Sequence, residues 1–184
     1  MQSHRRLPAA LCLSFAALTA LVVAAPWLAE ESSIRGLDGQ AWFLDHPQRW
    51  EAMPLPPRLA YTLGDLVCHQ KEERSYLLHG NQMPVCARDL GLLAGMAAGF
   101  ALTVAAEPRA RLVDSAAGLL HVRTKKGLVV AMTLLLAPLT VDGFLQLLTA
   151  YESTNVLRSA TGLLFGLGVS LLAGILLLTD PRLE

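Results

Sequence analysis

Charged side chains are scarce in this chain. Only 16% of its 184 residues are Asp, Glu, Lys or Arg, whereas a soluble domain carries about a quarter. Hydrophobic residues make up 53% of the sequence. The fifteen basic and fifteen acidic side chains cancel, so net charge favours neither nucleic acid nor an acidic substrate as a partner. This balance argues against a soluble domain and indicates a protein whose main partner is the lipid bilayer.

Cysteine is scarce as well, and the common cysteine and histidine motifs are missing. Three cysteines are too few for a disulfide scaffold. Their spacing matches no zinc finger, and neither CxxC nor HExxH is present. No short motif in the sequence therefore assigns a reaction by itself.

Long apolar runs, by contrast, are abundant. Four of them can cross the hydrocarbon core as helices, and they cover residues 9–28, 90–106, 127–150 and 159–178. The first is interpreted as an uncleaved span rather than a signal peptide, because Pro26 directly follows the small residues Ala24 and Ala25. The predicted fold is an all-α, polytopic integral membrane protein with a single membrane domain over residues 1–184.

Small residues recur at four-residue steps in the second and fourth spans. Such stripes let two helices approach closely in lipid, where van der Waals contact drives association. The two spans are therefore predicted to share a helix–helix seam. The stripes consist of Gly91, Gly95 and Gly99 in one span and Gly162, Gly166, Ser170 and Gly174 in the other.

Basic residues predict how the chain is oriented. Arg5, Arg6 and five basic residues of the 107–126 loop should be cytoplasmic under the positive-inside rule. Both termini are then cytoplasmic, and the protein is expected in the cell inner membrane with its long 29–89 loop outside. Within that loop, residues 58–70 have apolar residues at helical spacing and predict a short amphipathic helix.

The long loop carries most of the groups able to bind a metal. Cys68 and His69 lie at the end of the predicted amphipathic helix, and Cys86 and Asp89 lie just before the apolar run of the second span. One interpretation is a Cys68–Cys86 disulfide in an oxidising exterior. The other is a zinc or other transition-metal site with S, N and O ligands. His79 is an alternative nitrogen ligand, because neighbouring side chains on a helix diverge.

A second group of polar residues falls within or beside the last two spans. Asp142 lies inside the third span, where a carboxylate costs about 2.5–3.5 kcal/mol. Gln146 is one turn further along the same face, and Asn155 and Arg158 begin the fourth span. Arg158, a metal ion or protonation would offset the cost of Asp142, and a hydrogen bond between helices is the purely structural alternative.

Several short runs in the second half of the chain resemble a known family. They are Cys68-His69-Gln70, Arg74-Ser75, Pro84 to Gly91 (PVCARDLG), Asp142-Gly143 with Gln146, and Ser153 to Gly162 (STNVLRSATG). The chain is similar here, over about residues 60–175, to small multi-span membrane proteins catalogued as a domain of unknown function, number 2085. This resemblance implies a multi-span membrane protein and no established activity. Asp89 stands where that family usually has a second cysteine, which keeps a metal ligand and removes a two-cysteine redox pair.

Two main functional hypotheses follow. In the first, a metal held by Cys68, Cys86, Asp89 and either His69 or His79 serves an enzyme acting on a lipid-borne or amphipathic substrate. Its catalytic candidates are Asp142, His69, Gln146, Asn155 and Arg158. In the second, the chain is a non-enzymatic transport or assembly subunit with a structural Cys68–Cys86 disulfide and Asp142–Arg158 pair. A third hypothesis, an ion-coupled carrier, would need a homo-oligomer to enclose a path.

Overall fold

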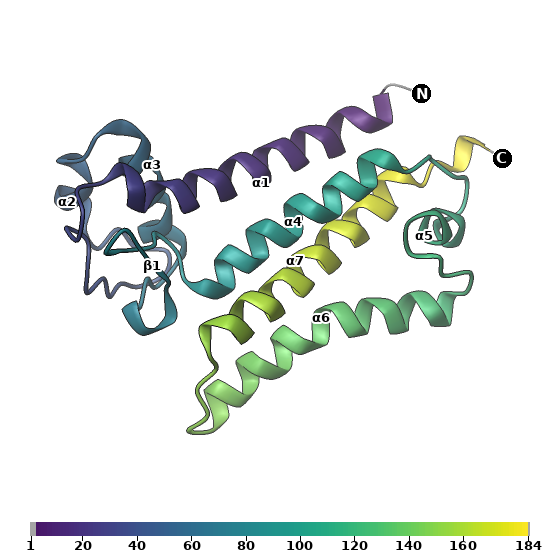
Figure 1. The fold of residues 1–184 in the computed structure, drawn as a ribbon. Coiled ribbons are helices and arrows are strands. Elements are labelled where there is room, and N and C mark those ends of the chain that lie inside the picture. The colour runs from purple at the N-terminus through teal and green to yellow at the C-terminus, as the bar shows by residue number, and fades with distance from the viewer. Residues whose placement is uncertain (1–2, 184) are drawn as a thin grey trace.

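Four long helices form a bundle, and a folded segment covers one of its ends (Figure 1). The computed structural model describes residues 3–183, so the predicted domain's residues 1, 2 and 184 lie outside the described part. All four helices are long and apolar enough to cross a membrane, which confirms the predicted all-α, four-span class. They are α1 (Ser3–Leu28), α4 (Ala87–Ala105), α6 (Lys125–Leu148) and α7 (Asn155–Leu178).

The helices α4 and α7 meet along the predicted seam of small residues. A methyl group added at Gly91 or Gly95 would overlap a backbone carbonyl oxygen of α7, and one added at Gly166 would overlap the carbonyl oxygen of Leu92 in α4. The two backbones are therefore in direct contact, as expected of small-residue packing in lipid. This contact fixes the positions of Cys86 and Asn155, the residues at the starts of the two helices.

A short helix that the sequence analysis left within a loop supports the opposite end of the bundle. This helix, α5 (Leu112–Leu120), lies between the ends of α6 and α7 that are remote from the folded segment (Figure 1). Its Ala116 packs with Leu128 and Met132 of α6 and Ile175 of α7. The 107–126 region is thus partly helical, and it closes the gap between two spans.

Residues 29–86 fold into what is called the cap below. Its elements are α2 (Pro47–Glu51), α3 (Leu55–Val67), the 3-10 helix η1 (Glu72–Arg74) and a hairpin of β1 (Leu77–Leu78) and β2 (Asn81–Gln82); a second 3-10 helix, η2 (Pro181–Leu183), ends the chain. In the hairpin, Leu77 pairs with Gln82 and Leu78 with Asn81. The two turn residues, His79 and Gly80, both have positive φ, as a tight hairpin turn requires.

The extended segment at the start of the cap is held by buried side-chain amides, where a regular sheet would use backbone hydrogen bonds. The backbone N–H of Ile34 donates to Asn81 Oδ1 at 2.8 Å, and that of Leu37 donates to Gln82 Oε1 at 2.9 Å. Because these amides satisfy backbone groups that would otherwise be buried without partners, the extended strand can pack against Trp50 and Tyr61. The cap is thus a small folded unit with its own core.

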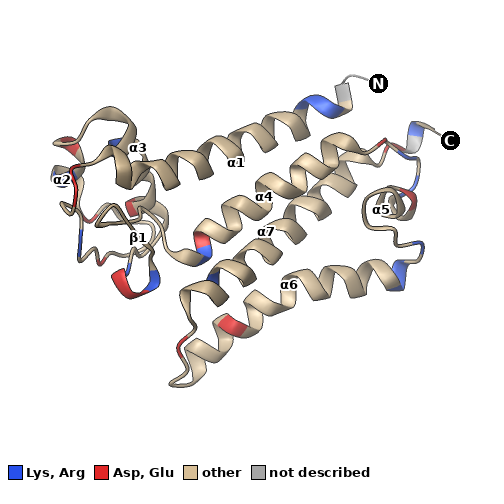
Figure 2. Ribbon diagram, viewed as in Figure 1, with Lys and Arg blue, Asp and Glu red and all other residues tan. Residues whose placement is uncertain are grey.

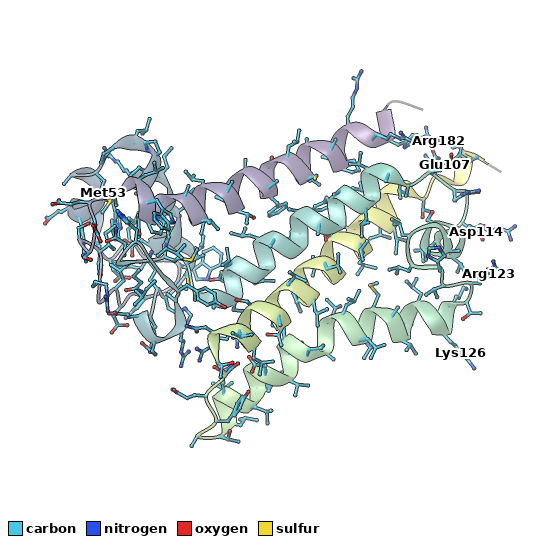
Figure 3. The ribbon with its side chains drawn as sticks, in the orientation of Figure 1. Met53, Glu107, Asp114, Arg123, Lys126 and Arg182 are labelled. Atoms are coloured by element: carbon cyan, nitrogen blue, oxygen red, sulfur yellow. The ribbon has the colours of Figure 1, made fainter. Side chains whose placement is uncertain are left out.

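Charge is distributed unevenly between the two ends of the bundle. Figure 2 shows basic residues at the start of α1, at the start of α6 and near the C-terminal end of the described chain, away from the cap. In Figure 3, Arg123, Lys126 and Arg182 lie at that end, whereas Met53 lies in the cap. The N- and C-terminal ends of the described chain also lie there (Figure 1). The predicted pattern, with basic loops on one side and the cap on the other, is therefore present in the fold.

Candidate functional site at the capped end

Three residues able to bind a metal meet where the cap joins the bundle. The sulfur atoms of Cys68 and Cys86 and a ring nitrogen of His69 all lie within 4.8 Å of one another. Both cysteines are buried, and both are free thiols. The two cysteines are brought together from the end of α3 and the start of α4, so the cluster depends on how the cap docks.

The end of α3 explains how the adjacent residues Cys68 and His69 both reach this cluster. The helix ends at Val67, and Cys68 has extended backbone angles, φ −125° and ψ 144°. The divergence expected for neighbours on a helix therefore does not apply. Cys68 Sγ lies 3.7 Å from His69 Nδ1 and accepts a hydrogen bond of 3.2 Å from the Cys86 backbone N–H.

Gly64 allows this close approach of α3 to the segment before α4. A Cβ atom at Gly64 would overlap the carbonyl oxygen of Pro84. The same carbonyl accepts a hydrogen bond of 2.6 Å from Gln70 Nε2. Together these contacts set the distance between the two cysteine-bearing segments.

Asp89 adjoins the cluster through Cys86 without joining the group of three, and His79 lies apart from it. The Cys86 thiol donates to Asp89 Oδ2 at 3.3 Å, so the carboxylate adjoins the cluster. His79 lies on the hairpin turn, where its ring stacks on Trp27 at 5.0 Å between centroids and its Nε2 lies 3.9 Å from Glu31. The structure does not bring His79 to the cysteines, because the turn directs it towards the end of α1.

The donor set and its spacing suit zinc. With Zn–S of about 2.3 Å and Zn–N of about 2.0 Å, a sulfur and a nitrogen ligand of tetrahedral zinc lie about 3.5 Å apart. The distance from Cys68 Sγ to His69 Nδ1 is 3.7 Å. Two thiols, an imidazole and a carboxylate are also the ligand types that zinc takes in proteins.

The surroundings of these groups change their acid–base properties. The hydrogen bond with Cys86, followed by burial, raises the pKa of the Cys68 thiol far above its usual value. Burial, followed by the positive charge of Arg74, lowers the pKa of His69. A lowered pKa favours the neutral imidazole, which is the form that ligates a metal.

Asp142 has a different ion partner from the one predicted. Its carboxylate, only 5% exposed, pairs with Nη2 of Arg88 in the first turn of α4, so the predicted Asp142–Arg158 pair is wrong. Gln146 Nε2 donates to Asp142 Oδ2 at 2.8 Å, and the Tyr151 hydroxyl lies 3.4 Å from Oδ1. The reason is geometric: Gln146 lies between Asp142 and Arg158 and accepts the hydrogen bond that Asp142 was expected to take.

Arg158 nevertheless belongs to the same network. It is 4% exposed and donates to Gln146 Oε1 at 3.2 Å and to Asn155 Oδ1 at 3.0 Å. Asn155 Nδ2 in turn donates to the backbone carbonyl of Ser75 in the cap at 3.1 Å. The four predicted residues Asp142, Gln146, Asn155 and Arg158 are therefore connected by hydrogen bonds, although not through the predicted pair.

Two further side chains that the sequence analysis did not select connect this network to the cap. The Tyr76 hydroxyl donates to the carbonyl oxygen of Asn155 at 3.1 Å and lies 3.0 Å from Ser159 Oγ. Ser159 Oγ donates to the carbonyl oxygen of Ala87 at 3.0 Å. Tyr76 directly follows the Arg74-Ser75 run, which was the available signal for it.

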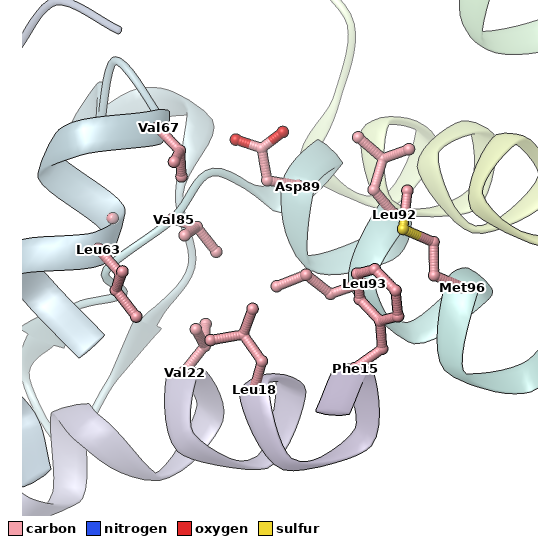
Figure 4. A pocket seen from close by; sticks show the side chains of 11 residues that line it. Phe15, Leu18, Val22, Leu63, Val67, Val85, Asp89, Leu92, Leu93 and Met96 are labelled. Carbon is pink, nitrogen blue, oxygen red and sulfur yellow. The ribbon is translucent and has the colours of Figure 1, made fainter. Parts of the chain in front are cut away.

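An apolar cavity of about 240 Å³ lies beside the cysteine cluster, between α1, α3 and α4. Val67 and Val85, the residues that precede the two cysteines, line it at one side, and Phe15 and Met96 line it within the bundle. Figure 4 shows Asp89 as the one charged side chain that borders this apolar space. The cavity has room for hydrocarbon next to a carboxylate that adjoins the candidate metal ligands.

Four apolar spans capped by a folded polar segment define a polytopic helical membrane protein. Within that class, the chain belongs to the family described as "Predicted membrane protein (DUF2085)", whose model matches residues 68–172. The matched region begins at Cys68 and contains every candidate site residue named above.

Two curated archaeal proteins are similar to part of this chain. An uncharacterized protein of Methanothermobacter thermautotrophicus is 34% identical over 110 residues, which are 60% of this chain and 86% of the relative. An uncharacterized protein of Methanocaldococcus jannaschii is 34% identical over 109 residues, 59% of this chain and 62% of the relative. No solved structure was found to match the chain. Neither relative has a named activity that would indicate what the site does.

Proposed function

We propose that this protein is a metal-assisted enzyme of the cell inner membrane that acts on a lipid-borne or amphipathic substrate. The observation that carries the proposal is the meeting of Cys68, His69 and Cys86, whose ligand atoms lie within 4.8 Å of one another. Three such S and N donors leave one position of a tetrahedral zinc or other transition metal open for water, and Asp89, hydrogen-bonded to Cys86, adds a carboxylate beside them.

The proposed roles follow from the hydrogen-bond network at the capped end of the bundle, the end at which the candidate metal ligands also lie. A bound metal would supply a nucleophile by lowering the pKa of coordinated water. Asp142 would accept or donate a proton, and Gln146, Asn155 and Arg158 would orient the polar end of the substrate. The last three residues are already held in place by their mutual hydrogen bonds, as a preorganised site requires.

A lipid-borne substrate is favoured by the cavity between α1, α3 and α4. Its lining is apolar apart from Asp89, so a hydrocarbon chain could lie there with its reactive end towards Cys86. Two helices of the lining, α1 and α4, are candidate membrane spans. A chain could therefore enter from the hydrocarbon layer without crossing water.

Metal content and free thiols, measured on the same purified sample, test the proposal. We expect about one equivalent of transition metal and no disulfide between Cys68 and Cys86. Cys68→Ser should abolish metal binding, whereas Cys12→Ser, a matched change of a half-buried cysteine in α1, should leave it unchanged. Metal-free protein with Cys68 bonded to Cys86 would contradict the proposal.

The proposal also places both termini in the cytoplasm and the cap outside. Its support is the concentration of basic residues at the uncapped end, including Arg5, Arg6 and Lys126. An alkaline phosphatase fusion at residue 75 should be active, and a fusion in the 107–126 region should be inactive. The reverse pattern would overturn the orientation and, with it, an externally accessible site.

A second function, a non-enzymatic transport or assembly subunit, is favoured by one observation. Asp142 is already paired with Arg88 and bonded to Gln146, as a structural ion pair would be. In that case Asp142→Asn should be tolerated when Arg88→Gln accompanies it. An enzyme should lose activity with Asp142→Asn alone while the protein stays folded.

A further inference from the structure

Three arginines from different elements gather at the capped end of the bundle. They are Arg74 of η1, Arg88 of α4 and Arg158 of α7. Asp142 and Gln146 connect Arg88 to Arg158, because Arg88 pairs with Asp142 while Gln146 bonds to both Asp142 and Arg158. Figure 2 shows basic residues at the starts of both α4 and α7.

Arg74 joins this group through the cap. Asn155 accepts a hydrogen bond from Arg158 and donates to the carbonyl oxygen of Ser75, the residue after Arg74. An ion pair and hydrogen bonds thus link Arg88 to Arg158 through Asp142 and Gln146, and Asn155 links Arg158 to the residue that follows Arg74.

The negative charges at this place do not balance the positive ones. The charge of Asp142 is already paired with that of Arg88. Glu73 lies 3.9 Å from Arg74 with a side chain that is 60% exposed, so water screens it. Within residues 3–183, Arg158 is bonded to the neutral oxygens of Gln146 and Asn155 and has no carboxylate at ion-pair distance.

Hydrogen-bond donors are left over as well. The Nε–H groups of Arg74 and Arg88 are buried and have no acceptor among the described residues. Only 4% of Arg158 is exposed. It lies near the start of α7, which is long and apolar enough to span a membrane. A buried cation with neutral partners is costly, and buried donors without acceptors add to that cost.

A phosphate group would satisfy all of these groups at once. It supplies negative charge and several acceptor oxygens, and the planar fork of an arginine matches two of those oxygens. We infer that Arg74, Arg88 and Arg158 bind a phosphate group, carried by a membrane lipid or present as free phosphate. The inference rests on the proposed function only in making this phosphate the polar end of the enzyme's substrate.

Two features put this binding site in a setting suited to a phosphorylated lipid. Arg88 lies in the first turn of α4, so a phosphate bound there would lie at the same, capped end of the bundle as the candidate metal ligands. A second, mostly apolar cavity of about 450 Å³ between α6 and α7 reaches Asp142, the ion partner of Arg88, so apolar space lies on this side of the arginines as well as between α1, α3 and α4.

Binding to the full-length purified protein tests the inference. The probes are a short-chain phosphatidic acid, inorganic phosphate, and the diacylglycerol of the same chain length as a phosphate-free control. We expect phosphatidic acid to bind, and its Kd to rise about tenfold in Arg158→Gln and several-fold in Arg74→Gln. Arg58→Gln removes an equal charge from an exposed position of the cap and should leave the Kd unchanged.

Each outcome decides the matter. Preference for phosphatidic acid over inorganic phosphate identifies a lipid phosphate, and equal binding of both identifies free phosphate. Binding of diacylglycerol as tight as that of phosphatidic acid, absence of binding by both phosphate probes, or an equal loss in Arg58→Gln would overturn the inference. If Arg158→Gln does not fold, Arg74→Gln decides, because its side chain is 28% exposed and is not part of the core.

Metal analysis of the same samples separates this inference from the proposed enzyme. Phosphatidic acid that still binds to metal-free Cys68→Ser protein would support the phosphate site independently of the metal. Metal-loaded protein that binds neither phosphate probe would overturn the phosphate site and leave the metal centre standing.

Discussion

At the scale of single residues, Arg88 and Asp89 divide the first turn of α4 between two sites. Arg88 reaches across to Asp142 in α6, whereas Asp89 accepts a hydrogen bond from the thiol of Cys86. Consecutive residues on a helix point about 100° apart, so neighbours can serve opposite sides of one helix. The cost of burying Asp142 is thereby offset by α4 and not by α7.

A double-mutant cycle tests which arginine is coupled to Asp142. Asp142→Asn and Arg88→Gln, alone and together, should give a coupling free energy of about 0.5–3 kcal/mol, because the two side chains form a direct ion pair. Asp142→Asn with Arg158→Gln should give a smaller coupling, since Gln146 lies between them. Unfolding of the detergent-solubilised variants by denaturant measures both.

A larger coupling of Asp142 with Arg158 than with Arg88 would contradict the Arg88–Asp142 ion pair.

The sequence alone could place Asp142, Gln146, Asn155 and Arg158 near one another, because span order and helical spacing decide their height in the bundle. It could not choose the ion partner. That choice depends on the rotation of α4 about its axis, which is set by the backbone contacts of Gly91 and Gly95 with α7.

At the scale of elements, the α4–α7 seam holds the site together. Gly95→Ala would place a methyl group against the carbonyl oxygen of Leu163, so the helices must separate. We expect a loss of about 1–3 kcal/mol in unfolding free energy, measured by denaturant in detergent. Gly143→Ala in α6, where nothing lies within 4 Å of the added atom, is the matched control and should be neutral or mildly stabilising. Equal effects of the two changes would argue against a close seam.

A carboxylate in the cap gives a prediction about pH. Glu72 accepts hydrogen bonds from Arg35 Nε at 2.8 Å and from the Gly36 N–H at 2.7 Å, and the bond from Arg35 is the main reason that the pKa of Glu72 is lowered. Because the pKa is lower in the folded state, this stabilisation is present above the unfolded pKa, about 4.3, and is lost as pH falls through the folded pKa.

Glu72→Gln should therefore speed hydrogen exchange at the Nε–H of Arg35 and the backbone N–H of Gly36 at pH 7. It should have little effect once the pH is below the pKa of Glu72 in the folded protein. Glu51→Gln, a change of an exposed carboxylate in α2, is the control and should have no such effect. If Glu72→Gln speeds hydrogen exchange equally at both pH values, the hydrogen bonds of Glu72 to Arg35 and Gly36 do not depend on the charge of the carboxylate.

The sequence predicted the spans well and the cap poorly, for physical reasons. Length and apolarity suffice to identify a span, and the α3 helix followed from its amphipathic spacing. The fold of residues 29–57 depends on Asn81 and Gln82 bonding to the distant backbone of Ile34 and Leu37, which no local pattern reveals. The α5 helix was not predicted although its apolar residues recur at helical spacing, because nine residues are too few to stand out as a membrane span.

At the scale of the whole molecule, the cysteine cluster is where the cap and the bundle meet. Cys68 belongs to the end of α3, Cys86 to the start of α4, and both pack with Val22 of α1. A metal bound here would connect the end of α3 to the start of α4, in addition to the apolar packing and hydrogen bonds that already join them. Metal binding should therefore contribute to the stability of the folded protein.

Removal of metal by a membrane-compatible chelator should lower the Tm of the purified protein, because a ligand that binds only the folded state stabilises it. Cys68→Ser should have a similarly low Tm and show no further change with chelator. Cys12→Ser should respond to the chelator as the natural sequence does. A Tm that does not depend on chelator in any of these proteins would show that no metal holds the cap to the bundle.

The extended residue at Cys68 has a consequence for how this cluster can work. Cys68 and His69 follow the last turn of a short helix, and Cys86 precedes the first turn of a long one, so the three donors lie at a joint between two pieces of the protein. A tilt of α3 relative to α4 would change the separation of the two sulfur atoms before it disturbed either helix. Any event that shifts the cap, including the entry of a lipid into the cavity between α1, α3 and α4, would thus first change the distance between these two sulfur atoms.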